Sequence, residues 1–194
     1  LGGAGMLGMF RIYSMSEDFM HHSFQEVSYM AQLRGEMGAI RQHEKDMIIG
    51  YEKPEAVKAA HTKWLESQDK AKKVASQFLE GQEDVDNPVV RDIIKKLDSY
   101  KEAFAHVARQ LEAGGYDTAT IANRMSGKAI AEFNEADKLM VALDDLLRGE
   151  VAKSVAEQKS VSEQTKWLFG LAVLITVVVV VPLTLLNMHS ICKP

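Results

Sequence analysis

Apolar residues recur at spacings of three, four and seven positions along four segments of this chain. Such spacing places each set on one face of an α-helix, whose period is about 3.6 residues. The period-two alternation that is typical of a half-buried strand does not occur in these segments. The recurring positions are, segment by segment, Val27, Met30, Leu33, Met37, Ile40 and Met47; Val57, Ala60, Trp64, Ala71, Val74 and Phe78; Val90, Ile94, Leu97, Phe104, Val107 and Leu111; and Ile130, Phe133, Met140, Leu143, Leu147, Val151 and Val155. The pattern predicts four amphipathic helices.

Glycine and proline mark the ends of these helices. Their clusters lie at residues 50–54, 81–88 and 114–115. Asn87 before Pro88 is typical of an N-cap with proline in the first helical turn. Gly114 suits the left-handed conformation that ends many helices, and Asp117 or Thr118 is suited to cap the next one. We expect helices near residues 12–50, 54–80, 88–113 and 118–166.

Helices of this kind with short connections bury their apolar stripes against one another. We therefore predict an all-α chain whose residues 12–166 form an antiparallel, up-down-up-down four-helix bundle. The first and fourth helices are the longest, and each leads into an apolar segment. We expect both to continue into transmembrane helices.

The run from Leu168 to Met188 contains no charged residue. At about 1.5 Å per residue it spans roughly 32 Å, close to the ~30 Å hydrocarbon core of a bilayer. Trp167 and Lys166 stand at its edge, where an indole can lie between lipid and water. We predict a transmembrane helix over residues 167–188; the alternative is a buried core helix.

The other end of the chain is also apolar. Residues 1–10 are glycine-rich and too few to span a membrane. We interpret residues 1–11 as the end of a first transmembrane helix whose beginning is missing, because the helical pattern continues unbroken from Arg11. The remnant of a signal peptide is the alternative.

Composition excludes several functions. The formal net charge of −4 is not that of a nucleic-acid-binding protein. The single cysteine, Cys192, lies beyond the apolar run, so the predicted bundle holds no thiolate site. No histidine follows a glutamate by three positions, as a di-iron bundle requires. No nucleophile motif or phosphate-binding loop is present. We expect no catalytic residue, no metal and no cofactor, and hence no enzyme.

Arginines give a more specific hypothesis. Arg34 and Arg41 are seven positions apart and share one helix face. Arg124 lies at the start of the fourth predicted helix. The polar residues that precede it are Thr118, Thr120 and Asn123. Guanidinium groups bind carboxylates bidentately, so converging arginines would hold a small organic acid. The alternative, that each arginine makes an ordinary surface ion pair, stays open.

Helix rise puts Arg41 roughly 14 Å and Arg124 roughly 11 Å from the tip of the predicted bundle. Between Arg41 and the tip lies the charged run Glu44-Lys45-Asp46. We interpret that run as a solvated turn rather than a ligand contact.

Two segments resemble bacterial methyl-accepting chemotaxis proteins. The first is Ile40-Arg-Gln-His-Glu-Lys-Asp-Met-Ile-Ile49, followed by Trp64 in the next helix. The second is Ser190-Ile-Cys-Lys-Pro194, which is similar to the start of a HAMP linker. The resemblance covers essentially the whole chain and indicates a four-helix-bundle sensor domain at residues 12–166 and a HAMP linker from residue 189. Helical sensor regions of some histidine kinases look similar.

The resemblance implies a homodimer packed along the first helix, with a ligand site near the membrane-distal end of that interface. In aspartate- and serine-sensing members, arginines of the first helix and the stretch leading into the fourth grip an amino acid. By position, Arg41 and either Arg34 or Lys45 match the first group. Thr118, Thr120 and Asn123 match the second, and we add Arg124 to the candidate ligand-binding residues.

Together these observations predict a transmembrane chemoreceptor of the bacterial inner membrane. Its periplasmic domain would bind an organic acid or an amino acid and pass a helix displacement inward. Two alternatives stay open: the sensor region of a histidine kinase, and a ligand-free bundle that binds a periplasmic protein.

Overall fold

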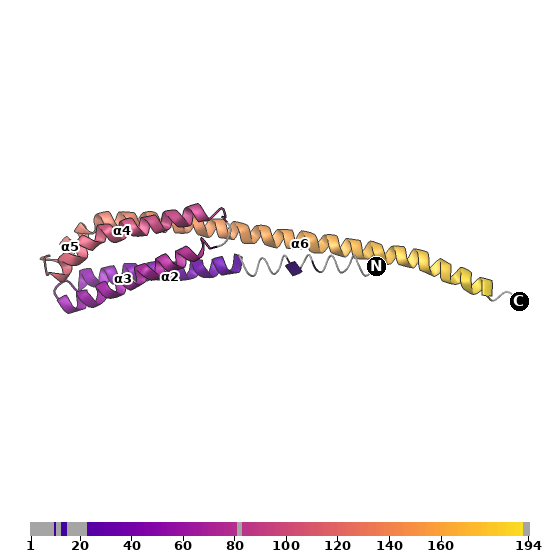
Figure 1. The fold of residues 1–194 in the computed structure, drawn as a ribbon, viewed down its shortest axis with the longest axis horizontal. Coiled ribbons are helices and arrows are strands. Elements are labelled where there is room, and N and C mark those ends of the chain that lie inside the picture. The colour runs from indigo at the N-terminus through magenta and orange to yellow at the C-terminus, as the bar shows by residue number, and fades with distance from the viewer. Residues whose placement is uncertain (1–9, 11–12, 15–22, 81–82, 192–194) are drawn as a thin grey trace. The chain divides into compact units, whose positions relative to one another are not determined.

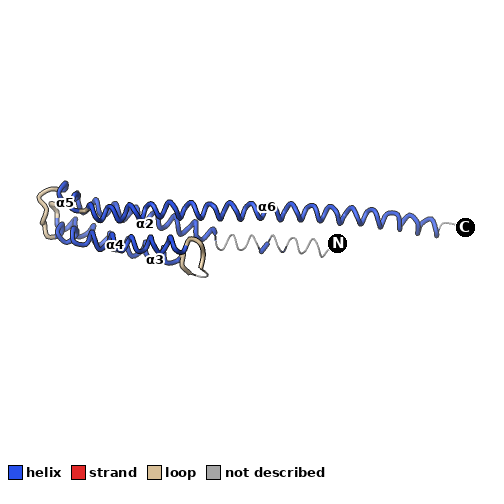
Figure 2. Tube along the Cα trace, turned by 90° about the horizontal axis from the view of Figure 1, so that it is seen from above, coloured by secondary structure: helices blue, strands red, loops and turns tan. Residues whose placement is uncertain are grey.

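The computed structural model describes residues 10, 13–14, 23–80 and 83–191 of the chain. Within these residues every regular element is an α-helix, and no strand is present (Figure 2). The predicted all-helical class is therefore confirmed. The first predicted transmembrane segment, residues 11–12 and 15–22 of the first helix, and residues 192–194 of the linker lie outside the described residues.

Two helices agree closely with the predicted ranges, α3 (Pro54–Gln77) and α4 (Asn87–Glu112). Helix α2 (Ser23–Ile49) ends within one residue of the predicted end at residue 50. Pro54 stands in the first turn of α3, where its missing N–H leaves no hydrogen bond unmade. Gly114 follows α4 with φ +66°, the left-handed conformation that the sequence predicts.

The fourth helix was predicted as one element over 118–166, and this prediction is wrong. A short helix, α5 (Ala119–Met125), ends at Ser126, and α6 (Gly127–Ile191) begins after it. Thr118 caps α5, with its hydroxyl accepting a hydrogen bond from the Ile121 amide at 3.2 Å. The buried Ser126 hydroxyl donates to the carbonyl of Ala122 at 2.9 Å, and Gly127 is a weak helix former. These neighbours explain the break.

Helix α6 then continues without interruption through the Lys166–Trp167 junction and on to Ile191. This continuity agrees with the prediction that one helix leads from the predicted bundle into the apolar run. Pro182 lies inside the helix, so the carbonyl one turn earlier lacks its usual amide partner.

The internal contacts divide the chain into two compact units, one of which is Phe24–Gly149. In that unit α2, α3, α4, α5 and the first part of α6 lie beside one another (Figure 1). Apolar residues from all five helices form one core, in which Leu33, Ile40 and Leu143 are fully buried. Most of the predicted apolar stripes face this core. Val27 and Val155 do not, since 46% and 52% of their surface is exposed.

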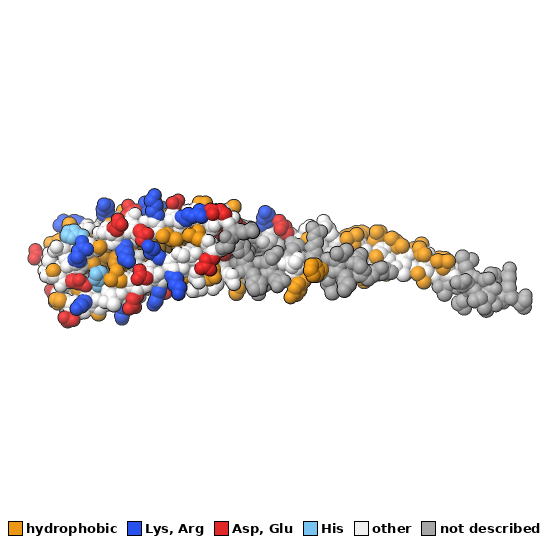
Figure 3. Space-filling model, in the orientation of Figure 1, with side chains coloured by type: hydrophobic (Ala, Val, Ile, Leu, Met, Phe, Trp, Pro, Cys, Tyr) orange, Lys and Arg blue, Asp and Glu red, His pale blue; other side chains and the backbone are white. Residues whose placement is uncertain are grey.

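The other unit includes Glu150–Pro194. Its described apolar side chains, from Trp167 to Leu183, are largely exposed. Figure 3 shows them along α6, whereas charges of both signs are interspersed over the helices of the first unit. The helix is long and apolar enough to cross a membrane.

The left-handed Gly114 generates a test of the α4 terminus. Gly114→Ala should lower the free energy of unfolding by about 1–2 kcal/mol, because a Cβ is unfavourable at positive φ. Gly149→Ala is the matched control, since its Cβ would meet open space inside a helix; it should stabilise slightly. Denaturant titration of the full chain in detergent measures both. A Gly114→Ala variant as stable as the parent would contradict this helix end.

Candidate functional site

Glu44 is completely buried, so its assignment to a solvated turn is wrong. Helix α2 continues to Ile49, and Glu44 lies four residues after Ile40 and three before Met47. Both neighbours belong to the core, and that spacing puts all three on one helix face. This spacing is the sequence pattern from which the burial of Glu44 could have been predicted.

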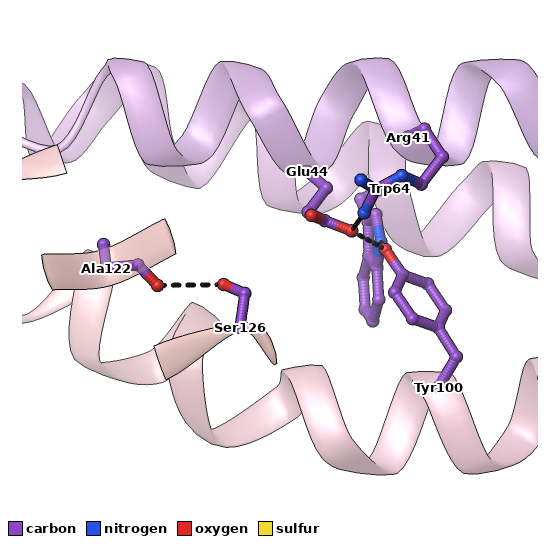
Figure 4. Close-up of polar contacts among 6 residues, drawn as sticks. All are labelled: Arg41, Glu44, Trp64, Tyr100, Ala122 and Ser126. Atoms are coloured by element: carbon purple, nitrogen blue, oxygen red, sulfur yellow. Dashed lines mark hydrogen bonds and ion pairs between the residues drawn. The ribbon is translucent and has the colours of Figure 1, made fainter. Parts of the chain in front are cut away.

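A chain of hydrogen bonds joins Glu44 to two other helices (Figure 4). Its Oε2 atom accepts a hydrogen bond from Arg41 Nη1, one turn earlier on α2. The same oxygen accepts from the hydroxyl of Tyr100 on α4, at 2.6 Å. The Tyr100 hydroxyl in turn accepts from the indole N–H of Trp64 on α3, at 2.9 Å. We call Arg41, Glu44, Trp64 and Tyr100 the buried polar network.

Aromatic rings surround this network. Tyr100 meets Phe133 of α6 edge-on, with ring centroids 5.2 Å apart, and Trp64 lies 5.3 Å from Phe104. The Arg41 guanidinium stands 5.3 Å from the centre of the Phe133 ring, a cation–π distance. Through Phe133 the network reaches α6, so it touches all four long helices of this unit.

Glu44 and Tyr100 are fully buried, and the lack of solvent affects the ionisation of Tyr100. Burial, the negative charge of Glu44 and the hydrogen bond to it raise the pKa of Tyr100 well above its usual range. Tyr100 therefore stays protonated and donates to Glu44. The second carboxylate oxygen of Glu44, Oε1, has no hydrogen-bond partner within the described residues.

A second contact of Trp64 links the network to the end of α4. The His61 ring lies 5.8 Å from the Trp64 ring. His61 Nδ1 is 2.7 Å from a carboxylate oxygen of Glu112, the last residue of α4. This pair connects α3 to α4 near the turn that leads to α5.

The predicted ligand-binding residues lie in two groups. Arg34 and Arg41 are on α2; Arg34 is 58% exposed and lies 3.8 Å from Asp144 of α6, whereas Arg41 belongs to the buried polar network. Thr118 caps α5. Thr120, Asn123 and Arg124 are exposed on α5.

In the part of the chain that the structure describes, none of these six residues makes a hydrogen bond or ion pair with another. The signal that singled out Arg41, its helical spacing, does not report its partner Glu44, nor Tyr100, which lies 56 positions after Glu44 and donates to the same oxygen.

Three carboxylates also converge elsewhere in the fold. Oxygens of Glu26, Asp84 and Asp86 lie within 4.8 Å of one another, and Glu26 and Asp86 are buried. Oxygen donors at this spacing are of the kind that hard divalent cations prefer. Each of the three also takes part in an interaction within the chain.

Comparison of the chain with protein-family models, with characterised proteins and with solved structures found no match. Functional inference therefore depends on the geometry of this site and on the helix that leads away from it.

The raised pKa of Tyr100 has a consequence for stability at alkaline pH. In the unfolded chain a tyrosine ionises near pH 10, whereas folded Tyr100 keeps its proton. Above about pH 10 the unfolded state therefore binds fewer protons, and stability should fall by about 1.4 kcal/mol per pH unit from this residue. Urea unfolding between pH 8 and 11 should show a shallower decline for Tyr100→Phe.

Tyr51→Phe is the matched control, because the Tyr51 hydroxyl bonds Glu52 at the exposed surface. The hydrogen bond to Glu52 raises the pKa of Tyr51 as well, but this hydroxyl is exposed, so the variant should change the slope less than Tyr100→Phe does. At neutral pH Tyr100→Phe should itself be less stable by about 1–3 kcal/mol, since two buried groups lose a partner. Equal slopes in parent and Tyr100→Phe would mean that Tyr100 ionises in the folded state.

Proposed function

We propose that this chain is the sensor region of a transmembrane receptor of the bacterial chemoreceptor class. Its domain at residues 12–166 would be a periplasmic four-helix bundle that binds an organic acid or an amino acid. Residues 167–188 would cross the inner membrane, and residues 189–194 would begin a HAMP linker. The proposal assigns no catalytic role to the chain.

One observation carries this proposal. A single helix, α6, contributes Phe133, Met140 and Leu143 to a protein core and later presents a charge-free apolar run. The first stretch is suited to a bundle and the second to lipid. A displacement of the first stretch along the helix axis would reach the second, because no loop separates them.

Contacts between helices support the antiparallel arrangement. His61 of α3 pairs with Glu112 of α4, and Lys72 of α3 pairs with Asp98 of α4. Residue numbers that rise along α3 therefore meet residue numbers that fall along α4. Between α2 and α6, Arg34 lies by Asp144, and Arg41 by Phe133, which gives the same relation. The short turn between α2 and α3 also favours opposite directions.

The buried polar network suggests how ligand binding would change the contacts between helices. Arg41 already binds Glu44, so a ligand carboxylate that reaches Arg41 must share or displace that partner. Glu44 also accepts from Tyr100, and the exchange would therefore change the contact between α2 and α4. Arg124 and the polar residues of α5 would supply the other side of the site. A ligand that prefers one arrangement shifts the population toward it.

The ion pairs of Arg34 and Arg41 favour a second candidate function. Arg34 and Arg41 both have carboxylate partners within the chain, so neither needs a ligand to balance its charge. A bundle of this kind would instead bind a periplasmic protein through its surface. The sensor region of a histidine kinase would share this arrangement of a bundle and a membrane helix.

The ligand hypothesis is tested by thermal-shift screening of the full chain in lipid nanodiscs against small organic acids and amino acids. We expect at least one compound to raise the melting temperature. Arg124→Ala should weaken its binding by up to about fivefold, because Arg124 is exposed and an exposed charge pair contributes about 1 kcal/mol or less. Arg41→Ala should be made with Glu44→Gln, because it would otherwise leave Glu44 buried without its cation.

Arg148→Ala is the matched control, because Arg148 makes an exposed ion pair with Asp144 away from α5. It should bind the compound as the parent does. Equal binding by Arg124→Ala and by the Arg41→Ala/Glu44→Gln double variant would reject this site. A screen without any hit would favour the protein-binding bundle.

Dimer formation along α2 is tested by cysteine crosslinking. On α2, Met30 and Met37 are buried in the core, whereas Phe24 and Ala31 are exposed. Gly35 and Gly38 are also exposed, and a Cβ there meets nothing within 4 Å. Cysteines at 31, 35 and 38 should crosslink between copies in membranes. A cysteine at Lys63, exposed on α3, should not; crosslinking only at 63 would contradict the interface.

A further inference from the structure

We propose that Glu44 is a proton-binding site whose carboxylate takes up one proton from solvent when Arg41 leaves it. The proposal rests on the proposed function only for the event that moves Arg41, which would be the arrival of a ligand carboxylate. It adds to that function a coupling between ligand binding and external pH.

The carboxylate of Glu44 has a single compensating charge. Among the described residues, the charged or titratable groups that contact it are Arg41 on α2 and Tyr100 on α4. The two other helices packed here contribute Trp64 and Phe133, neither of which titrates. Arg41 is therefore the cation that keeps Glu44 ionised.

Burial makes that dependence strong. Glu44 is fully buried, and a carboxylate without a cation in such a place is neutralised rather than tolerated as a charge. Tyr100 can donate a hydrogen bond but stays a phenol, because burial and Glu44 raise its pKa. Oxygen Oε1 has no partner in the described part of the chain, so it is the atom on which the proton would sit.

A route for exchange is present in the geometry. The Arg41 side chain is 24% exposed, whereas that of Glu44 is 1% exposed, so Arg41 is the member of the pair that a solute can reach. Capture of Arg41 by a ligand carboxylate would leave the neutral acid of Glu44 hydrogen-bonded to Tyr100. In the pH range in which Glu44 is ionised in the ligand-free protein, ligand affinity should then rise up to tenfold for each unit by which the pH falls.

The test uses no ligand, so it succeeds or fails independently of the receptor proposal. Arg41→Met removes the charge and keeps most of the bulk. Infrared difference spectra of the full chain in nanodiscs at pH 7 should show a carboxylic-acid C=O band that the parent lacks. The band should disappear in Arg41→Met/Glu44→Gln.

Arg34→Met is the matched control. Arg34 also pairs with a carboxylate, but its partner Asp144 is 25% exposed and keeps a second cation, Arg148, at 2.8 Å. This variant should show no acid band at pH 7. A band of equal size in Arg34→Met would mean that any lost arginine produces it, which would overturn the assignment to Glu44.

Stability gives a second measurement if Arg41→Met folds poorly at pH 7. Because its folded state would bind one more proton than its unfolded state, its melting temperature should rise by about 3–5 °C per pH unit as pH falls from 8 to 6. Adding Glu44→Gln to Arg41→Met should remove this pH dependence of the melting temperature and restore folding. No acid band at any pH at which Arg41→Met is folded would overturn the proposal, as would a double variant that remains unfolded.

Discussion

The burial of one negative charge sets the main constraint on this fold. Removing the carboxylate of Glu44 from water is unfavourable by several kcal/mol unless a cation and hydrogen-bond donors replace the solvent. Arg41 supplies the cation from one turn away, and Tyr100 supplies a donor from another helix. Tyr100 belongs to α4, and Trp64, which donates to Tyr100, belongs to α3. The Phe133 ring beside Arg41 belongs to α6. Four helices must therefore meet at this level.

Helix α6 satisfies a different constraint, since its two stretches suit different surroundings. Up to Leu147 its apolar residues recur with a helical period, and those of one face, such as Phe133, Met140 and Leu143, are buried. From Trp167 to Leu183 they cover the helix on all sides and are exposed. A run of that kind is unfavourable in water and favourable in lipid, because a helix pairs its own backbone groups; Pro182 is the exception in this run. Thr176 turns its hydroxyl back to the Ala172 carbonyl, so it too presents no free polar group.

The sequence predicts the helices well because periodicity and turn residues act locally. Pro54, Gly114 and Thr118 each influence only the nearest turn, and each lies where the pattern places it. The break at Ser126 escaped prediction because a serine and a glycine in an otherwise helical pattern are weak local signals. The network escaped because its partners are distant in sequence, and a charged residue on an apolar stripe was assigned to solvent. Helical spacing identified Arg41 but not what it binds.

The buried polar network differs in kind from the core around it. Apolar stripes that repeat about every seven residues can slide by one turn with partial loss of packing, because dispersion and burial have little directional preference. The bonds from Arg41 and Tyr100 to one oxygen of Glu44 require a fixed distance and angle, and a one-turn slide of about 5 Å breaks both. The network therefore fixes α2 against α4, while the apolar layers supply most of the stability. A displacement of α2 along its axis past α4 therefore has to change these contacts.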